Sequence, residues 1–178
     1  MIKKIAITLA VIFVLLFGAF QLLTYQTKKA SPEQLEKYMN DDIVLEVVYC
    51  SPSKKGRIVM DSLVPFGEVW RTGANEATTF TASEDITISG QPLPAGTYTL
   101  WTIPNQKEWE VIFNSGEYGW GVNWSQEVSR DASFDVLNIT TPVMQLPVNQ
   151  ERFTIQFEGD VNLTMAWENT KISMPISL

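Results

Sequence analysis

The clearest structural pattern in the chain is Phe153-Thr-Ile-Gln-Phe-Glu-Gly-Asp-Val-Asn-Leu-Thr-Met-Ala-Trp167, in which apolar and polar residues alternate on both sides of Gly159-Asp160. Alternation with a period of two places the apolar side chains on one face of a β-strand. A Gly-Asp pair between two such runs is typical of a hairpin turn. The stretch therefore predicts two antiparallel strands, residues 152–158 and 161–167, each with one buried face.

Other segments of the chain have the same composition of short β-branched and aromatic runs, ended by Gly, Pro, Asn or Asp. They are residues 43–49, 77–82, 86–89, 97–103, 108–113, 135–140 and 171–176. A turn is expected at Glu168-Asn169-Thr170, ahead of the last of them. About eight or nine strands with short turns and no long amphipathic helix predict an all-β fold, an antiparallel β-sandwich of jelly-roll or immunoglobulin-like type.

The amino terminus has the pattern of a membrane segment. A basic head is followed by 21 almost entirely apolar residues, Ile5 to Tyr25, which as a helix reach roughly 31 Å and span a bilayer core. The alternative is a cleaved secretory signal, but Leu16 and Phe17 ahead of the small residues Gly18 and Ala19 make a poor cleavage site. We therefore predict a signal anchor at residues 1–29, with secretion after cleavage as the alternative.

This anchor predicts the organisation of the rest of the chain. A short basic head usually stays in the cytoplasm, so the following domain is expected in the periplasm, tethered to the inner membrane. Residues 30–42 are expected to form a polar linker with a short helix over 32–39, because Ser31, Pro32 and Gln34 form a helix-start pattern. Residues 43–178 are expected to form the exported sandwich.

Composition excludes several classes of chemistry. The 178 residues include no histidine and one cysteine, Cys50. The missing imidazole excludes Ser-His-Asp and Cys-His catalysis and histidine metal sites. A single thiol excludes an intrachain disulfide and a multi-thiolate zinc site. No cofactor and no metal are therefore expected, and Cys50, in an apolar run, is expected to be a small core residue.

Charge is distributed unevenly along the chain. Four lysines and no acidic residue precede residue 30, so nine basic and 20 acidic residues follow it, a net charge of −11. A domain this acidic repels phosphate backbones, and nucleic acid is therefore not expected as a partner.

Polar groups able to recognise a ligand are most crowded in residues 61–80, where two turns flank Trp70-Arg71. Loops of this kind on a rigid scaffold often carry function, and the rigid fork of an Arg side chain suits two-point recognition of a carboxylate. The ligand-binding candidates here are Glu68, Trp70, Arg71, Asn75 and Glu76. The alternative is that Arg71 forms an internal ion pair that holds the loop, and that Asn75 only provides turn geometry.

A second candidate loop is Glu117-Tyr-Gly-Trp-Gly-Val-Asn-Trp-Ser125. Aromatic rings can cover the apolar C–H face of a sugar while amides and carboxylates bind its hydroxyls. Trp101 and Trp109 lie in predicted strands and are expected in the core, whereas this glycine-rich loop is too polar to be buried throughout. Trp120 and Trp124 therefore join the ligand-binding candidates, with packing over the end of the sandwich as the alternative.

Several short motifs follow one another in order through the predicted domain. They are Lys55-Gly-Arg57, Leu63-Val-Pro-Phe-Gly67, Val69-Trp-Arg-Thr-Gly-Ala-Asn-Glu-Ala-Thr78, Leu93-Pro-Ala-Gly-Thr-Tyr98 and Trp120-Gly121. This order resembles the DUF2911 family of exported bacterial proteins over residues 44–175. The chain departs from the family pattern at Met60-Asp61, where members often have a glycine. The resemblance implies an exported β-rich domain and no particular activity, because the function of the family is unknown.

Three hypotheses of function follow from the sequence. We favour a membrane-tethered β-sandwich that binds an envelope sugar or a partner protein through its two loops. The first alternative is a carboxylate-dependent hydrolase of envelope glycans that uses Glu68 and Glu76, since glycoside hydrolysis needs two suitably spaced acids. The second is a structural or interaction module in which the motif residues only hold turns.

Overall fold

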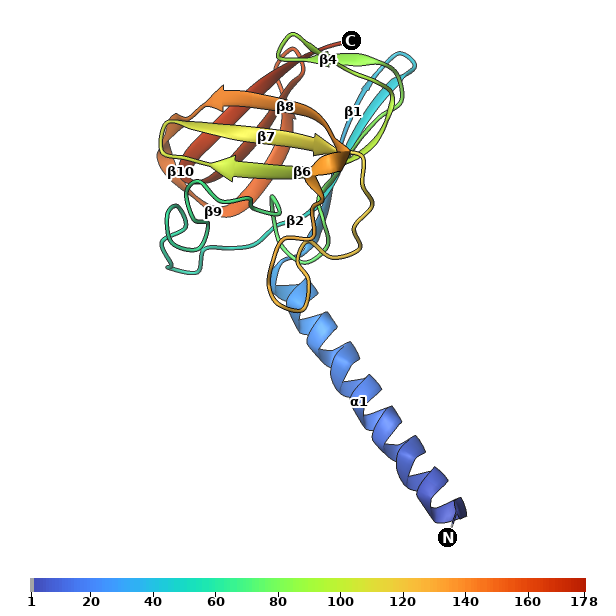
Figure 1. Cartoon of the computed structure of the whole chain (residues 1–178). Coiled ribbons are helices and arrows are strands. Elements are labelled where there is room, and N and C mark those ends of the chain that lie inside the picture. Colours follow the sequence, from blue (N-terminus) through green and yellow to red (C-terminus); the bar gives the residue numbers. More distant parts are fainter. Residues whose placement is uncertain (1) are drawn as a thin grey trace.

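The computed structural model describes residues 2–178 as one long helix followed by a sandwich of two antiparallel sheets (Figure 1). The predicted all-β sandwich is confirmed, with ten strands where eight or nine were expected. In order, the elements are α1 (Ile2–Ala30), β1 (Glu33–Asn40), β2 (Ile43–Cys50), β3 (Thr79–Ala82), β4 (Ile86–Ile88), β5 (Gln91–Leu93), β6 (Gly96–Pro104), β7 (Glu108–Asn114), the 3-10 turn η1 (Ala132–Phe134), β8 (Asp135–Pro142), β9 (Met144–Glu158) and β10 (Asn162–Ser177).

The two sheets enclose the main core. The larger sheet has the strand order β1-β2-β3-β6-β7-β8 and the smaller one β5-β4-β10-β9. The predicted hairpin is present, with Glu158 paired to Asn162 across the turn at Gly159-Asp160. Its alternating apolar side chains are buried between the sheets as the pattern predicts; they include Phe153, Ile155, Leu163, Met165 and Trp167.

The helix expected over residues 32–39 is wrong, because this segment is strand β1. It pairs with β2 over its whole length, from Glu33 opposite Cys50 to Asn40 opposite Ile43. The pairing satisfies backbone groups that β2 would otherwise expose at a sheet edge. Tyr38 also packs against Phe157 of β9, with ring centroids 6.1 Å apart. These long-range contacts outweigh the local helix-start signal.

The turn expected at Glu168-Asn169-Thr170 is also wrong. Strand β10 continues through this segment to Ser177, and its register with β9 shifts on both sides of Glu168. Glu168 has a φ of 57°, and its carboxylate lies 2.9 Å from the ammonium of Lys54. The turn-like composition therefore marks a bulge-like irregularity within a strand, not a reversal of the chain.

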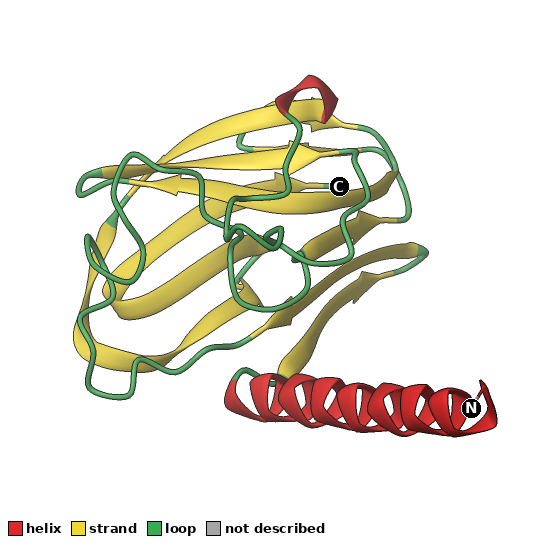
Figure 2. Ribbon diagram, turned by 60° about the horizontal axis from the view of Figure 1, so that its bottom comes forward, coloured by secondary structure: helices red, strands yellow, loops and turns green. Residues whose placement is uncertain are grey.

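Two long loops cover the outer face of the larger sheet. Successive residues of a strand face opposite sides, so Leu100 of β6 enters the main core while Trp101 enters a second cluster with Ala77 and Ile112. Partly buried side chains from the loops complete this cluster; they are Val69, Tyr118 and Val128. We call residues 61–78 the Arg71 loop and residues 115–131 the tryptophan loop. Figure 2 shows loops gathered on the side of the sandwich from which the helix leaves.

Helix α1 projects away from the sandwich (Figures 1 and 2). The segment Lys3–Ala30 has a mean hydropathy of 2.6, and it is long and apolar enough to cross a membrane. An uncleaved anchor and a signal sequence both have these properties.

Candidate functional site

A groove of about 370 Å³ opens between the Arg71 loop and the tryptophan loop. Residues of the Arg71 loop from Leu63 to Ala74 line one side, and Val122, Gln126 and Val128 of the tryptophan loop line the other. Trp167 of β10 also contributes to its surface. The structure therefore brings together the two loops that the sequence singled out.

Trp70 holds the Arg71 loop against both sheets. Its backbone N–H donates to the carbonyl of Thr102 at 2.7 Å, and its own carbonyl accepts from Thr102 N at 3.0 Å. Its ring stacks on Trp167 at a centroid distance of 6.0 Å and meets Phe153 edge-on at 5.0 Å. Trp70 is thus a packing residue that also lines the groove.

The backbone that follows Arg71 has unusual geometry. Thr72 has a φ of 51° and Gly73 a φ of 141°, and a Cβ at Gly73 would lie 2.9 Å from the carbonyl oxygen of Cys50. A β-branched residue rarely adopts a positive φ. Contacts hold it here, since the Thr78 hydroxyl donates to the Thr72 carbonyl at 2.7 Å. Backbone strain of this kind is concentrated at functional sites, where surrounding structure over-determines it.

The side chain of Arg71 lines the groove. Among residues 2–178 its guanidinium makes no hydrogen bond or ion pair, so the internal ion pair considered as an alternative is not formed. The aliphatic part of its side chain lies against Gly121, where an added Cβ would be 2.7 Å from Arg71 Cδ. Burial lowers the pKa of the guanidinium. The result is a half-buried cation at the surface of a groove.

Asn75 and Glu76 face the end of α1 instead. Asn75 Nδ2 donates to the carbonyl oxygens of Ser31 at 3.3 Å and Thr27 at 3.5 Å, and Glu76 Oε1 lies 2.7 Å from Lys28 Nζ. Burial by itself would raise the pKa of Glu76, but hydrogen bonds, chiefly from Lys28, outweigh it and lower that pKa. These contacts join the helix to the sandwich.

Cys50 contacts the second carboxylate oxygen of Glu76, the one that does not pair with Lys28. It is 2% exposed, as expected for a core residue, and its thiol donates to Glu76 Oε2 at 3.4 Å. Burial is the main cause of its raised pKa, and the hydrogen bond to Glu76 adds to it. The thiol is therefore held in its protonated, unreactive form.

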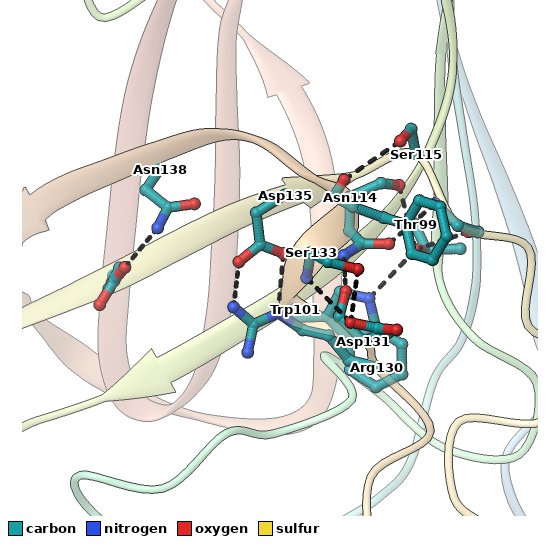
Figure 3. Close-up of polar contacts among 12 residues, drawn as sticks. Thr99, Trp101, Asn114, Ser115, Arg130, Asp131, Ser133, Asp135 and Asn138 are labelled. Carbon is teal, nitrogen blue, oxygen red and sulfur yellow. Dashed lines mark hydrogen bonds and ion pairs between the residues drawn. The ribbon is translucent and has the colours of Figure 1, made fainter.

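A polar network holds the tryptophan loop at its two ends (Figure 3). Buried Asn114 donates from Nδ2 to the Asp131 carbonyl at 2.8 Å and to Asp135 Oδ1 at 2.7 Å, while its Oδ1 accepts from Gly116 N at 2.8 Å. Arg130 forms an ion pair with Asp135. The network joins residues at the end of β7 to residues at the start of β8, so the loop between them begins and ends at defined positions.

The tip of the tryptophan loop is exposed. Trp124 is 96% and Trp120 39% exposed, whereas Trp101 and Trp109 are buried as predicted. Gly121 N donates to the carbonyl of Asn75 at 3.0 Å, which ties this loop to the Arg71 loop. The two exposed rings are not among the residues that line the groove.

Comparison with known families adds one finding. A family model described as a protein of unknown function, DUF2911, matches residues 31–176. The chain belongs to the DUF2911 family. The match confirms the resemblance read from the motifs, and it includes β1, both loops and every residue of the groove. No curated protein and no solved structure matches this DUF2911 chain.

The seven sequence-derived candidates of this DUF2911 protein therefore fall into three groups. Glu68, Trp70 and Arg71 line the groove. Asn75 and Glu76 contact α1. The last two, Trp120 and Trp124, lie on the exposed tryptophan loop. Glu68 lines the groove and Glu76 is not among its lining residues; the carboxylate of Glu76 contacts Lys28 and Cys50 instead.

The sequence reasoning missed an ion pair close to the groove. Lys54 Nζ lies 2.9 Å from Glu168 Oε1 and donates to Asn149 Oδ1 at 3.2 Å. Glu168 Oε2 also accepts from the backbone N–H groups of Val59 at 3.3 Å and Met60 at 3.4 Å. Lys54 and Glu168 are 114 positions apart, so no local pattern could have indicated the pair.

Proposed function

We propose that this DUF2911 protein is a membrane-tethered binding protein whose groove takes a carboxylate group carried by an envelope glycan or by a partner protein. Arg71 is the anion-binding residue. The observation that carries the proposal is a half-buried guanidinium that lines a groove and, within the described chain, has no acceptor of its own.

The energetic argument rests on the cost of burying an unpaired charge. Removing a guanidinium from water costs free energy unless hydrogen-bond acceptors replace the lost water. A ligand carboxylate supplies two such acceptors in the geometry that the planar guanidinium fork prefers. The apolar side chains of Val64, Val122 and Val128 line the same groove, and partial exclusion of water strengthens a charged hydrogen bond.

Other groups at the groove suit a ligand that also carries hydroxyl or amine groups. Glu68 and Gln126 are exposed and line the groove beside Arg71. A carboxylate accepts hydrogen bonds, while an amide both donates and accepts them. An acidic sugar or the carboxyl end of a peptide would present a suitable combination of groups.

The tether is the second part of the proposal. The apolar segment Lys3–Ala30 supports it, as does the junction of Asn75 and Glu76 with the end of the helix. The basic residues Lys3 and Lys4 ahead of the first apolar segment support an amino terminus in the cytoplasm. The acidic sandwich then lies on the periplasmic side.

The hydrolase hypothesis has less support. Two carboxylates must flank one bond to catalyse glycoside hydrolysis. Glu68 lines the groove, whereas Glu76 is held by Lys28 at the end of α1.

A binding experiment on the full chain in lipid nanodiscs tests the proposal. Oligogalacturonate and an acidic peptide serve as carboxylate probes, and a neutral galactose oligomer of equal length serves as the reference. Ligand at 100 times its dissociation constant adds about 2.7 kcal/mol to the stability of the folded state, which thermal unfolding detects. Whichever carboxylate probe binds identifies the source of the group.

Two variants sharpen this experiment. Arg71→Met should abolish the shift, because it removes the anion-binding group and keeps the bulk of the side chain. Arg152→Met is the matched control: Arg152 is an exposed arginine that donates to the Ser51 carbonyl at 3.2 Å, and its loss should leave binding unchanged. Equal binding by Arg71→Met, equal binding of the neutral sugar, or no binding of either carboxylate probe would refute the proposed function.

A further inference from the structure

We infer that the tip of the tryptophan loop contacts the lipid headgroup layer of the membrane that α1 crosses, with Trp124 and Trp120 as interfacial anchors. This inference rests on the membrane tether of the proposed function and is independent of the ligand in the groove. It assigns a lipid surface as the partner of an exposed aromatic loop.

The first argument is a chain of contacts from the helix to the loop. The side chain of Asn75 donates to the carbonyls of Thr27 and Ser31 at the end of α1. The backbone carbonyl of Asn75 accepts from Gly121 N at 3.0 Å. One residue of the Arg71 loop thus separates the tryptophan loop from the point where the helix leaves the bilayer. In Figure 1 the tryptophan loop, drawn in yellow to orange, lies beside that end of α1.

The second argument is depth. The apolar run of α1 ends at Tyr25, and the six residues from there to Ser31 rise about 9 Å along the helix axis. The headgroup region adds roughly 5–8 Å to each side of the hydrocarbon core, so residues 26–30 lie at headgroup level and Ser31 lies just beyond its outer edge. Trp124 is three residues beyond Gly121, a reach of at most about 11 Å. The ring therefore lies within about this distance of Gly121, which is comparable with the thickness of the headgroup layer.

The third argument is that a hydrogen-bonded hairpin holds Trp124 at the surface. Residues 122–128 form a small hairpin in which Val122 bridges Val128 and Asn123 N donates to the Glu127 carbonyl at 2.8 Å. Asn123 Oδ1 accepts from Ser125 N at 2.8 Å. Trp124 lies at the tip of this hairpin and is 96% exposed. A large apolar ring held in water is unfavourable, whereas Trp rings favour the membrane interface.

The net charge of the sandwich favours lipids with zwitterionic or neutral headgroups as the partner of the loop. The sandwich is strongly acidic, so anionic lipids would repel it. Tyr25 is 65% exposed near the end of the helix, and Lys28 and Lys29 follow it. Such residues mark the interfacial level of a membrane helix, and the two loop tryptophans would extend this belt.

The test is fluorescence quenching of the full chain in phosphatidylcholine vesicles whose acyl chains carry bromine close to the headgroup. Of the other four tryptophans, Trp101, Trp109 and Trp167 are each at most 1% exposed, and Trp70 is partly buried against the core. Quenching relative to unbrominated lipid is expected, and it should fall by at least half in Trp124→Phe and further in the double variant Trp120→Phe/Trp124→Phe.

A control places a tryptophan elsewhere on the surface. Met39 is 63% exposed and lies near the end of β1, about 20 Å along the strand from Glu33. Adding Met39→Trp to the double variant restores an exposed tryptophan but should not restore quenching. Restored quenching there would show that bromine reaches exposed rings non-specifically and would overturn the inference.

A second measurement distinguishes a failure of the membrane tether from a failure of the contact between the loop and lipid. Vesicles washed with alkaline carbonate should retain the full chain; release into the wash would overturn the tether and the inference with it. Retention combined with equal quenching of wild type and the double variant would leave the tether intact and overturn only the contact of the loop with lipid.

Discussion

Lys54 and Arg71 are two partly shielded cations near the same groove, and they differ in their partners. Lys54, with a side chain 16% exposed, has the carboxylate of Glu168 at 2.9 Å and the amide oxygen of Asn149 at 3.2 Å. Arg71 has neither an anion nor a neutral acceptor among residues 2–178. Both side chains lose part of their contact with water. Only Lys54 gains acceptors within the described chain that replace the lost hydrogen bonds to water.

This difference indicates which of the two cations stabilises the fold. Glu168 joins Lys54 to the backbone N–H groups of Val59 and Met60, so this pair holds the segment that precedes the Arg71 loop against β10. Removing one member of a buried pair leaves an uncompensated charge. Among residues 2–178 Arg71 has no such counterpart, and under the proposed function the carboxylate of a ligand supplies one.

The largest expected effect is that of Lys54→Met. It leaves the Glu168 carboxylate shielded from water and without its cation, so we expect a loss of about 3 kcal/mol in the free energy of unfolding. Urea unfolding of the full chain measures it. Glu168→Gln removes the charge on the other side and should also destabilise. If Lys54→Met unfolds with the wild-type midpoint, the pair has no structural role and the comparison fails.

A smaller effect is expected from pH. Burial by itself would raise the pKa of Glu168, but hydrogen bonds from Lys54 and from the backbone of Met60 and Val59 outweigh it and lower that pKa. A carboxyl whose pKa is lower in the folded state stabilises the fold above its ordinary pKa, and this contribution is lost as pH falls through the folded value. The difference in the free energy of unfolding between wild type and Lys54→Met should therefore narrow as the pH falls from about 6 to about 3.

The control for this pH effect is the Glu168→Gln variant, which has no carboxyl to titrate. The free energy of unfolding of Glu168→Gln should differ from that of the double variant Lys54→Met/Glu168→Gln by the same amount throughout this pH range. A gap between wild type and Lys54→Met that widens with acid would contradict the assigned sign.

The smallest effect is expected for Arg71→Met without ligand. Replacing an unpaired, half-buried cation by an apolar side chain of similar length is near neutral or stabilising, so the free energy of unfolding should change by less than about 1 kcal/mol. The same urea titration measures it. A loss as large as that of Lys54→Met would show that Arg71 has a structural partner, and the groove would then lose its anion site.

Local patterns in the sequence were sufficient for most of the sandwich. Alternation in residues 153–167 predicted the β9–β10 hairpin, and the buried positions of Trp101 and Trp109 followed from their places in apolar strands. The local signal failed where long-range contacts compete with it. Residues 32–39 carry a helix-start pattern but form β1, because β2 offers an edge to pair with.

The candidate site shows the same limit. The sequence singled out both loops, because turn residues, tryptophans and charges are concentrated there. The sequence could not predict which charged residues form ion pairs with one another. Glu76 is paired with Lys28 and Glu168 with Lys54. Both pairs join residues that are far apart in the chain.

By itself the sequence determined the class of this protein: an apolar helix, an acidic all-β domain of the DUF2911 family, and no imidazole chemistry. These properties depend on composition and on short periodic patterns. Only the tertiary structure decided that Arg71 lines a groove with no partner among residues 2–178, that Asn75 and Glu76 hold the helix, and that Trp124 lies on an exposed tip. Such contacts arise from the packing of distant segments, and a side chain's immediate neighbours in the sequence do not specify them.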